Sequence, residues 1–232
     1  MRKGESMEEK NRYYGVIFDL DGTLLDTLRD LQESINAVFE KHGIPARSLD
    51  EVRSFVGNGV ARLMARCLDG GEEHPAYAML LQEYRSYYKT HCSNHTCPYQ
   101  GIPQLLRLLK ERGVKTAIVS NKFDGATKEL KDVYFPNLID AAVGENEAAG
   151  IRKKPAPDMV YTVIDELHLV KENCLYVGDS EVDIRTAAEA GLPCICVTWG
   201  FRDKEELIEA GGTCFADTPE ELLQKITGML YL

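Results

Sequence analysis

The sequence has no apolar run of eighteen residues, and it is short of positive charge. The missing run excludes an ordinary membrane-spanning helix, so no membrane partner is expected. The 27 basic and 37 acidic residues give a formal net charge of -10, which repels phosphate backbones and argues against a general nucleic-acid binder. The first twelve residues are too polar to contain the apolar stretch of a secretion signal, so a cytoplasmic protein is predicted.

Cysteine pairing is also missing, because the seven cysteines are scattered and none has C-x-x-C spacing. They are expected to be reduced thiols. One dense group, His91, Cys92, His95 and Cys97, offers two sulfurs and two imidazoles in seven residues. Since no second cluster supplies zinc-finger spacing, the segment is interpreted as a linker in preference to a metal site.

The chain does have enough apolar residues for a buried sheet, at 44% of 232. Short apolar runs that end in polar loops predict strands at 14–18, 115–119, 174–177 and 193–197. Helical periodicity predicts helices at 103–112, 157–167, 182–190 and 204–210. This alternation indicates an α/β fold with a parallel sheet covered on both faces, whose ligands gather at the carboxyl ends of the strands.

Residues 26–96 break the alternation, because they show helical periodicity and no convincing strand. The segment His42-Gly43-Ile44-Pro45 and the segment Cys67-Leu68-Asp69-Gly70-Gly71 supply breaks between helices. The pattern predicts an all-helical insertion after the first strand.

Polar residues that could bind a ligand or take part in catalysis follow the predicted strands. Asp19 and Asp21 come directly after the first strand, and two oxygens from such a pair suit a hard cation such as Mg²⁺. Ser120 and Asn121 follow the second strand and can donate hydrogen bonds to phosphoryl oxygens. Taken alone, each pair is better interpreted as an ordinary turn.

Two further motifs lie toward the C-terminal side. Lys154 lies between Lys153 and Pro155 at a helix start, where it is a fixed point charge or a solvated lysine. Asp179 ends the strand predicted at 174–177, and Asp183 lies one turn further on. Helix capping is the simple alternative for these two carboxylates.

The four motifs in this order, Asp-x-Asp, Ser-Asn, Lys-Pro and Gly-Asp-Ser-x-x-Asp, resemble the signature motifs of the haloacid dehalogenase-like phosphatase superfamily. The resemblance implies a Rossmann-like core from residues 1–25 and 97–232, with residues 26–96 as a helical cap. The motif from Gly178 to Gly191, the segment from Val197 to Arg202 and the cap segment from Phe55 to Val60 are most similar to the phosphoglycolate phosphatase subgroup.

The resemblance also implies roles for the aspartates. Asp19 is expected to be the nucleophile, and Asp21 the general acid and base. Mg²⁺ is the expected cofactor, held by Asp19, the backbone carbonyl of Asp21 and Asp179.

The remaining motif residues are expected to serve the transferring phosphoryl group. Ser120 and Lys154 would bind it. Asn121 would contact substrate or brace its loop, with neither role preferred. Asp183 would act indirectly, by orienting metal-bound water or Lys154.

These expectations amount to a magnesium-dependent phosphatase of a small phosphorylated metabolite, with phosphoglycolate as the first substrate to test. Alternatives are a β-phosphoglucomutase-like phosphomutase, a pyrophosphatase or a non-catalytic binding module. The cap is predicted to read the substrate through Gly57, Asn58, Gly59 and Arg62, although a solvated Arg62 fits the sequence equally well. The oligomeric state and any opening of the cap are left open.

Overall fold

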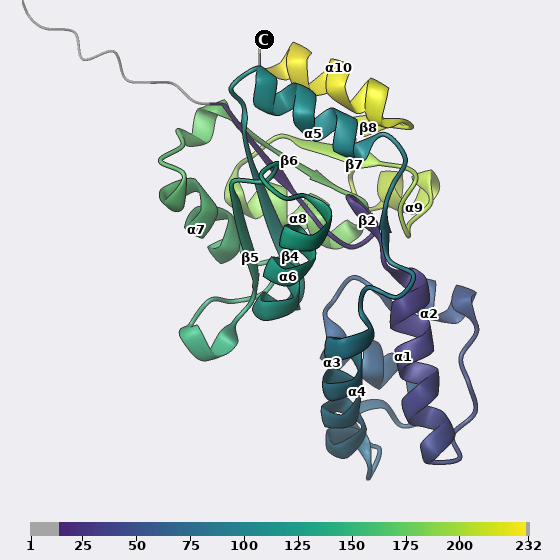
Figure 1. Ribbon diagram of the computed structural model, residues 1–232. Helices are drawn as coiled ribbons and strands as arrows, with labels where there is room; N and C mark the ends of the chain where they lie inside the picture. Colours follow the sequence, from purple (N-terminus) through teal and green to yellow (C-terminus); the bar gives the residue numbers. More distant parts are fainter. Residues whose placement is uncertain (1–13, 231–232) are drawn as a thin grey trace, which may run out of the picture.

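A six-stranded parallel sheet forms the centre of the computed structural model, which describes residues 14–230 (Figure 1). The polar segment 1–12, on which the prediction about secretion rests, lies outside the described residues. The strand order is β5-β4-β1-β6-β7-β8, and neighbouring strands are parallel, as predicted. The strands are β1 (Gly15–Phe18), β4 (Lys115–Phe123), β5 (Ala141–Glu145), β6 (Cys174–Gly178), β7 (Cys194–Val197) and β8 (Phe215–Ala216).

Helices cover both faces of this sheet because successive strand side chains point in opposite directions. Val16 and Phe18 of β1 belong to a core shared with α5 (Ile102–Glu111), α6 (Asp124–Tyr134) and α10 (Pro219–Met229). Ile17, between them, belongs to a second core shared with α7 (Asp158–Glu166) and α8 (Glu181–Ala190). The remaining core helix is α9 (Lys204–Glu209), and single 3-10 turns occur at η1 (Gly71–Glu73), η2 (Glu147–Ala149) and η3 (Lys171–Asn173).

Four elements of the core lie outside the sequence prediction: β5, β8, α6 and α10. β8 has two residues, and β5 reads Ala-Ala-Val-Gly-Glu, which is too small and mixed to stand out. α10 did carry a signal, because Thr218 caps it and Pro219 opens it. The strand predicted at 115–119 continues to Phe123, since Phe123 pairs with Glu145 across an irregular register. Ser120 and Asn121 are therefore strand residues and not loop residues.

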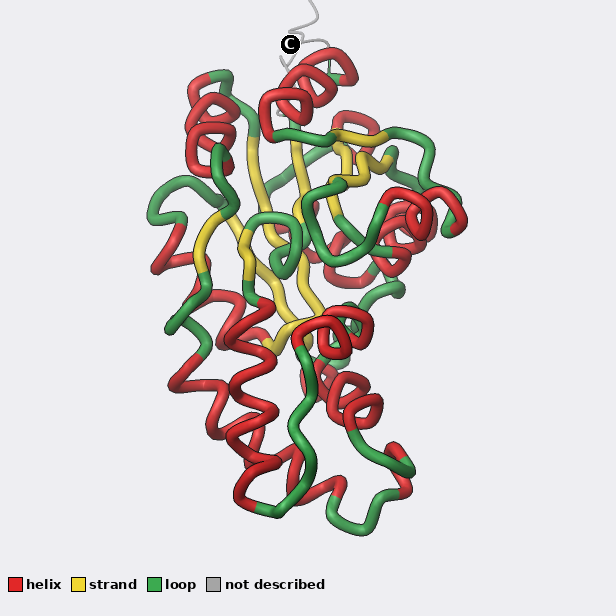
Figure 2. Tube along the Cα trace, turned by 90° about the vertical axis from the view of Figure 1, so that its right-hand side faces the viewer, coloured by secondary structure: helices red, strands yellow, loops and turns green. Residues whose placement is uncertain are grey.

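Four helices lie within residues 26–96: α1 (Leu28–Lys41), α2 (Leu49–Phe55), α3 (Val60–Cys67) and α4 (Tyr77–His91). We refer to them as the helical insertion. It joins the sheet domain through a short antiparallel pair, β2 (Leu25–Asp26) with β3 (Cys97–Pro98). Figure 2 shows its helices gathered beyond one end of the sheet. Within residues 14–230, no helix is both long and apolar enough to span a bilayer.

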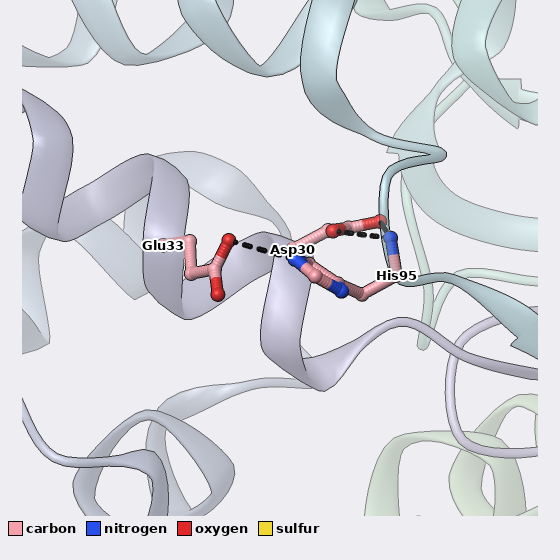
Figure 3. A group of neighbouring side chains, drawn as sticks. All are labelled: Asp30, Glu33 and His95. Atoms are coloured by element: carbon pink, nitrogen blue, oxygen red, sulfur yellow. Dashed lines mark hydrogen bonds and ion pairs between the residues drawn. The ribbon is translucent and has the colours of Figure 1, made fainter.

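The chain that leaves the insertion is fastened by a buried carboxylate, Asp30 of α1. It accepts hydrogen bonds from the backbone N–H of His95 at 2.9 Å and of Thr96 at 2.8 Å, and from the Thr96 hydroxyl at 2.8 Å. Figure 3 shows Asp30 and Glu33 directed toward His95, whose Nε2 lies 3.1 Å from a Glu33 oxygen. These bonds fix the returning linker against the start of α1.

The same contacts explain the His/Cys segment as a linker. Among the described residues, no three of His91, Cys92, His95 and Cys97 lie close enough to share a metal ion. His91 stacks on Tyr87, Cys92 is buried, and Cys97 is exposed in β3. His95 instead meets Asp30 and Glu33, and hydrogen bonds to the linker already occupy the Asp30 oxygens.

We predict that Asp30→Ala lowers the free energy of unfolding by about 2 to 4 kcal/mol, because it leaves buried N–H donors without an acceptor. Urea denaturation measures the change. Glu33→Ala on the same helix is the matched control, and as a half-exposed charge it should alter stability by about 0.5 kcal/mol or less. Equal losses in the two variants would contradict the anchoring role of Asp30.

Candidate active site

The carboxyl ends of neighbouring strands bring the sequence motifs together. Asp19 directly follows β1, Asp179 directly follows β6, β4 carries Ser120, and the loop before α7 carries Lys154. Together with Asp21, these residues line one cavity between the sheet and the helical insertion. Parallel strands place their carboxyl ends along one edge of a sheet, which is why residues 160 positions apart meet here.

Lys154 is the centre of the charge network in this cavity. Its ammonium nitrogen lies 2.8 Å from Oδ1 of Asp19 and 2.8 Å from Oδ1 of Asp183. The Tyr176 hydroxyl adds a bond to the same Asp183 oxygen at 3.1 Å, and Ser180 binds the other oxygen. Asp183 and Asp19 thus hold the Lys154 ammonium between them.

Asp179 lies under a layer of backbone that only glycine allows. Its carboxylate accepts hydrogen bonds from the Thr23 hydroxyl at 3.1 Å and the Phe201 N–H at 2.8 Å. A Cβ on Gly22 would lie 2.2 Å from an Asp179 oxygen, and one on Gly200 would lie 2.3 Å from Asp179 Cβ. Gly22 also has a φ of +85°, which disfavours other residues.

The balance of buried charge is negative. Asp19, Asp179 and Asp183 have carboxylate oxygens within 4.8 Å of one another, with Lys154 as the buried cation among them. Burial, then the charge of Asp183, raises the pKa of Asp179 to about 7. The same two causes raise the pKa of Asp19 well above its ordinary value, against the opposing effect of Lys154.

Burial alone would lower the pKa of Lys154, but Asp183 and Asp19 outweigh it, so the pKa lies above its ordinary value and the ammonium stays charged. An all-oxygen set of crowded carboxylates, with too little positive charge among them, fits a hard divalent cation. Asp19 and Asp179 supply two such donors.

The two residues of the Ser-Asn motif have different surroundings. The Ser120 hydroxyl oxygen accepts the Lys122 N–H at 3.2 Å, and its own proton has no partner among residues 14–230, so it remains available to a bound oxygen. The Asn121 amide is fully used: it donates to the carbonyls of Gly57 and Lys154 and accepts the Lys154 N–H at 2.7 Å. The structure therefore favours bracing for Asn121 over phosphate binding.

Lys122 has no role in the sequence motifs described above. Its side chain is buried, and Nζ lies 3.0 Å from Oδ1 of Asp21 and 2.7 Å from the hydroxyl of Tyr88 in α4. One sequence feature could have drawn attention to it: a lysine that comes directly after an apolar strand and the Ser-Asn pair. No sequence pattern indicates Tyr88 as its partner, because the two residues belong to different parts of the fold.

The predicted substrate-reading residues divide into two pairs. Gly57 and Gly59 line the cavity, whereas Asn58 and Arg62 do not. Arg62 is exposed and pairs with Glu72 at 3.4 Å. It points outward because α3 buries Val60, Leu63 and Met64 on its other side.

Arg202, which sequence analysis also left without a role, connects the insertion to the sheet domain. It is buried and donates to the backbone carbonyl of Arg53 at 3.0 Å and of Val56 at 2.6 Å, at the C-terminal end of α2. Cations are favoured at helix C-termini, where carbonyls lack partners. Its third bond goes to Glu181 in α8 at 3.2 Å.

The fold and the site together define a class of enzymes with a Rossmann-like parallel sheet, in which an aspartate directly after a central strand is paired with a buried lysine. The sequence matches the haloacid dehalogenase-like hydrolase family over residues 16–197, and the chain belongs to that family.

Individual relatives agree with this membership. A Rhodobacter capsulatus protein named phosphoglycolate phosphatase is 35% identical over 192 residues, which is 81% of this chain and 85% of the relative. A Cereibacter sphaeroides protein of the same name is 32% identical over 218 residues, 91% and 98% of the two chains. A Lactobacillus delbrueckii crystal structure, provisionally named phosphoglycolate phosphatase, is 35% identical with a TM-score of 0.86, and the match covers 93% and 98%.

We predict that Arg202→Ala loosens the contact between α2 and the sheet domain, because it removes two donors from carbonyls at the end of α2. Amide hydrogen exchange in residues 53–60 should accelerate by about tenfold, the equivalent of one lost hydrogen bond. Mass spectrometry of peptides that cover this segment measures the rate. Lys204→Ala, which removes a half-exposed cation nearby, is the control, and unchanged exchange in Arg202→Ala would contradict this contact.

Proposed function

We propose that this protein is a magnesium-dependent phosphatase that hydrolyses phosphoglycolate, a small phosphate monoester, through an aspartyl-phosphate. The observation that carries the proposal is the buried Asp19 carboxylate, held 2.8 Å from Lys154 within the carboxylate cluster. Relatives named phosphoglycolate phosphatase support the choice of substrate. The proposed partner is a small metabolite in the cytoplasm; the acidic net charge disfavours nucleic acid, and the lack of a long apolar run disfavours a membrane partner.

In the first step, an Asp19 oxygen attacks phosphorus and the bond between phosphorus and the ester oxygen breaks. Oδ1 of Asp19 is occupied by Lys154 and by the Leu20 N–H at 2.6 Å, which leaves Oδ2 as the attacking oxygen. The Lys154 ammonium and the Ser120 hydroxyl stabilise the phosphoryl oxygens as charge shifts among them.

Asp21 moves the protons. It gives one to the departing alkoxide, then takes one from the water that attacks the aspartyl-phosphate, which releases phosphate and restores Asp19. Its Oδ1 atom has no hydrogen-bond donor in good geometry among the described residues, although Lys122 lies 3.0 Å away. A carboxylate in this state is free to exchange a proton with a bound group.

Magnesium would be held by Asp19, Asp179 and the backbone carbonyl of Asp21. Bound there, it would neutralise carboxylate and phosphoryl charge. Asp183 remains committed to Lys154 through the 2.8 Å contact, which keeps the phosphate-binding ammonium in position.

A phosphomutase is disfavoured by the wall that the insertion contributes. A mutase must hold a second phosphate while the sugar phosphate turns around. The side chains that the insertion brings to the cavity are Leu31, Val56, Val60 and Leu63, which are all apolar, with Gly57 and Gly59 beside them. This wall offers no cation to a second phosphate, so a mutase would have to hold it with cations of the sheet domain alone. A non-catalytic module is disfavoured because every carboxylate and the lysine of the motifs are present.

We predict that Asp19→Asn and Asp21→Asn both abolish turnover but differ in trapping. With Mg²⁺ and beryllium fluoride, a phosphoryl mimic should attach to Asp19 in Asp21→Asn, which keeps the nucleophile, and not in Asp19→Asn. Fluorine NMR detects the bound species, and wild-type protein is the positive control. Equal trapping in the two variants would contradict these roles.

We predict that Mg²⁺ binding strengthens as the pH rises, because the raised pKa of Asp179, about 7, makes the ion displace a proton at lower pH. The Kd should fall by about fivefold from pH 6 to pH 7, while the number of protons released on binding falls from about 0.9 to about 0.5, because half of Asp179 is already ionised at pH 7. Calorimetry in buffers of different ionisation enthalpy measures both quantities. Asp179→Asn should release fewer protons than the wild type but not none, because the pKa of Asp19 is also raised, and a pH-independent Kd in the wild type would contradict the prediction.

The raised pKa of Asp179 also makes the free energy of unfolding depend on pH. The folded metal-free protein holds the Asp179 proton more tightly than the unfolded chain, where aspartate titrates near 3.8. The metal-free protein should therefore lose stability as the pH rises from about 4 to 7, and Mg²⁺ should restore it. Thermal unfolding across this range, with and without the ion, measures the effect.

A further inference from the structure

Three cationic side chains line the described part of the active-site cavity: Lys122, Lys154 and Arg202. Lys154 is held between two carboxylates on the phosphoryl side of the cavity. Arg202 is occupied with Glu181 and with the carbonyls at the end of α2. Lys122 is therefore the remaining cation of the cavity lining. Its position is explained neither by binding of the phosphoryl group nor by the contact of Arg202 with α2.

The surroundings of Lys122 leave one donor unused. Its ammonium carries three N–H donors. One is accepted by the Tyr88 hydroxyl, whose ring lies 4.6 Å from Nζ, and a second is assigned to the ion pair with Asp21 at 3.0 Å, which lacks good hydrogen-bond geometry. The third has no partner among residues 14–230, although the side chain is only 2% exposed. A buried ammonium with an unused donor beside a cavity favours an anion in that cavity.

The position of this donor relates it to the leaving group. If Asp21 protonates the departing oxygen, that oxygen must come within hydrogen-bond distance of Asp21. Lys122 lies 3.0 Å from the Asp21 carboxylate, so it lies beside the leaving group and not beside the phosphoryl group. In phosphoglycolate one methylene separates the ester oxygen from the carboxylate, which keeps the two anionic ends within a few ångströms of each other.

We infer that Lys122 determines specificity, by pairing with a carboxylate on the leaving group of the substrate. The inference rests on the proposed phosphatase function and adds the residue that reads the organic part of the substrate. The apolar wall from the insertion supplies no competing cation. Tyr88 of α4, in the insertion, accepts a hydrogen bond from the Lys122 ammonium. Recognition of the substrate carboxylate therefore depends on contact between the insertion and the sheet domain.

The test compares two esters of the same size, phosphoglycolate and its amide, in which a neutral carboxamide replaces the carboxylate. Wild-type protein should show a higher kcat/KM for the carboxylate, and Lys122→Met should lose roughly tenfold or more of that preference, the equivalent of a charge-assisted hydrogen bond. Lys122→Arg, which keeps the charge, should retain part of it. Lys128→Met, the same change at an exposed lysine in α6, should leave the ratio as in wild type.

Binding provides a readout that does not need turnover. Calorimetry of both esters with Asp19→Asn, and with Asp19→Asn combined with Lys122→Met, should show the same loss of preference for the carboxylate. A purely structural role for Lys122 would lower the affinity and the kcat/KM for both esters equally, and that result would overturn the inference. A wild-type protein without a preference for the carboxylate would also overturn it. If wild-type protein with Mg²⁺ released no phosphate from any ester, the proposed function would fail, while the binding comparison would still decide the role of Lys122.

Discussion

Carboxylates that would repel one another are forced together at one edge of the sheet, and much of the site depends on how their charge is balanced. Asp19 and Asp183 share the ammonium of Lys154, while Asp179 is held by N–H and O–H donors and has a raised pKa. Such a cluster is costly in the absence of a cation, because buried charge is poorly solvated. The site therefore holds in place, before any ligand arrives, the negative charge that a metal ion and a phosphoryl group together require.

The packing around this cluster also holds the functional side chains in fixed positions. Gly22 and Gly200 allow backbone to approach Asp179 more closely than any side chain would permit. Asn121 ties the strand that carries Ser120 to the loop that carries Lys154. The functional side chains are thus held by backbone and by one another, which is what catalysis by positioning requires.

The helical insertion completes the cavity with an apolar wall and with polar connections to the sheet domain, among them the bond from Asn121 to the Gly57 carbonyl. Arg202 reaches the end of α2 from the sheet domain, and Tyr88 reaches Lys122 from α4. The Arg202 bond satisfies a backbone carbonyl at the end of α2, and the Lys122 bond satisfies the buried hydroxyl of Tyr88. Contact between the insertion and the sheet domain therefore satisfies polar atoms and also covers the site. Asp30 holds the linker at the base of the insertion, away from the chemistry.

The sequence by itself determined the alternating α/β pattern, the place of the insertion and the residues of the four motifs, because apolar periodicity and short motifs are local properties. It also indicated Asp19 and Asp179 as neighbours, through the rule that parallel strands end at one edge, and the resemblance of the four motifs added Lys154 to them. It did not reveal β5, whose small residues form a strand only because β4 offers them a partner. Only the tertiary structure decided that Arg62 faces solvent, that Asn121 braces a loop, and that Lys122 meets both Asp21 and Tyr88. Those outcomes depend on contacts between residues from 10 to more than 100 positions apart, which no local pattern encodes.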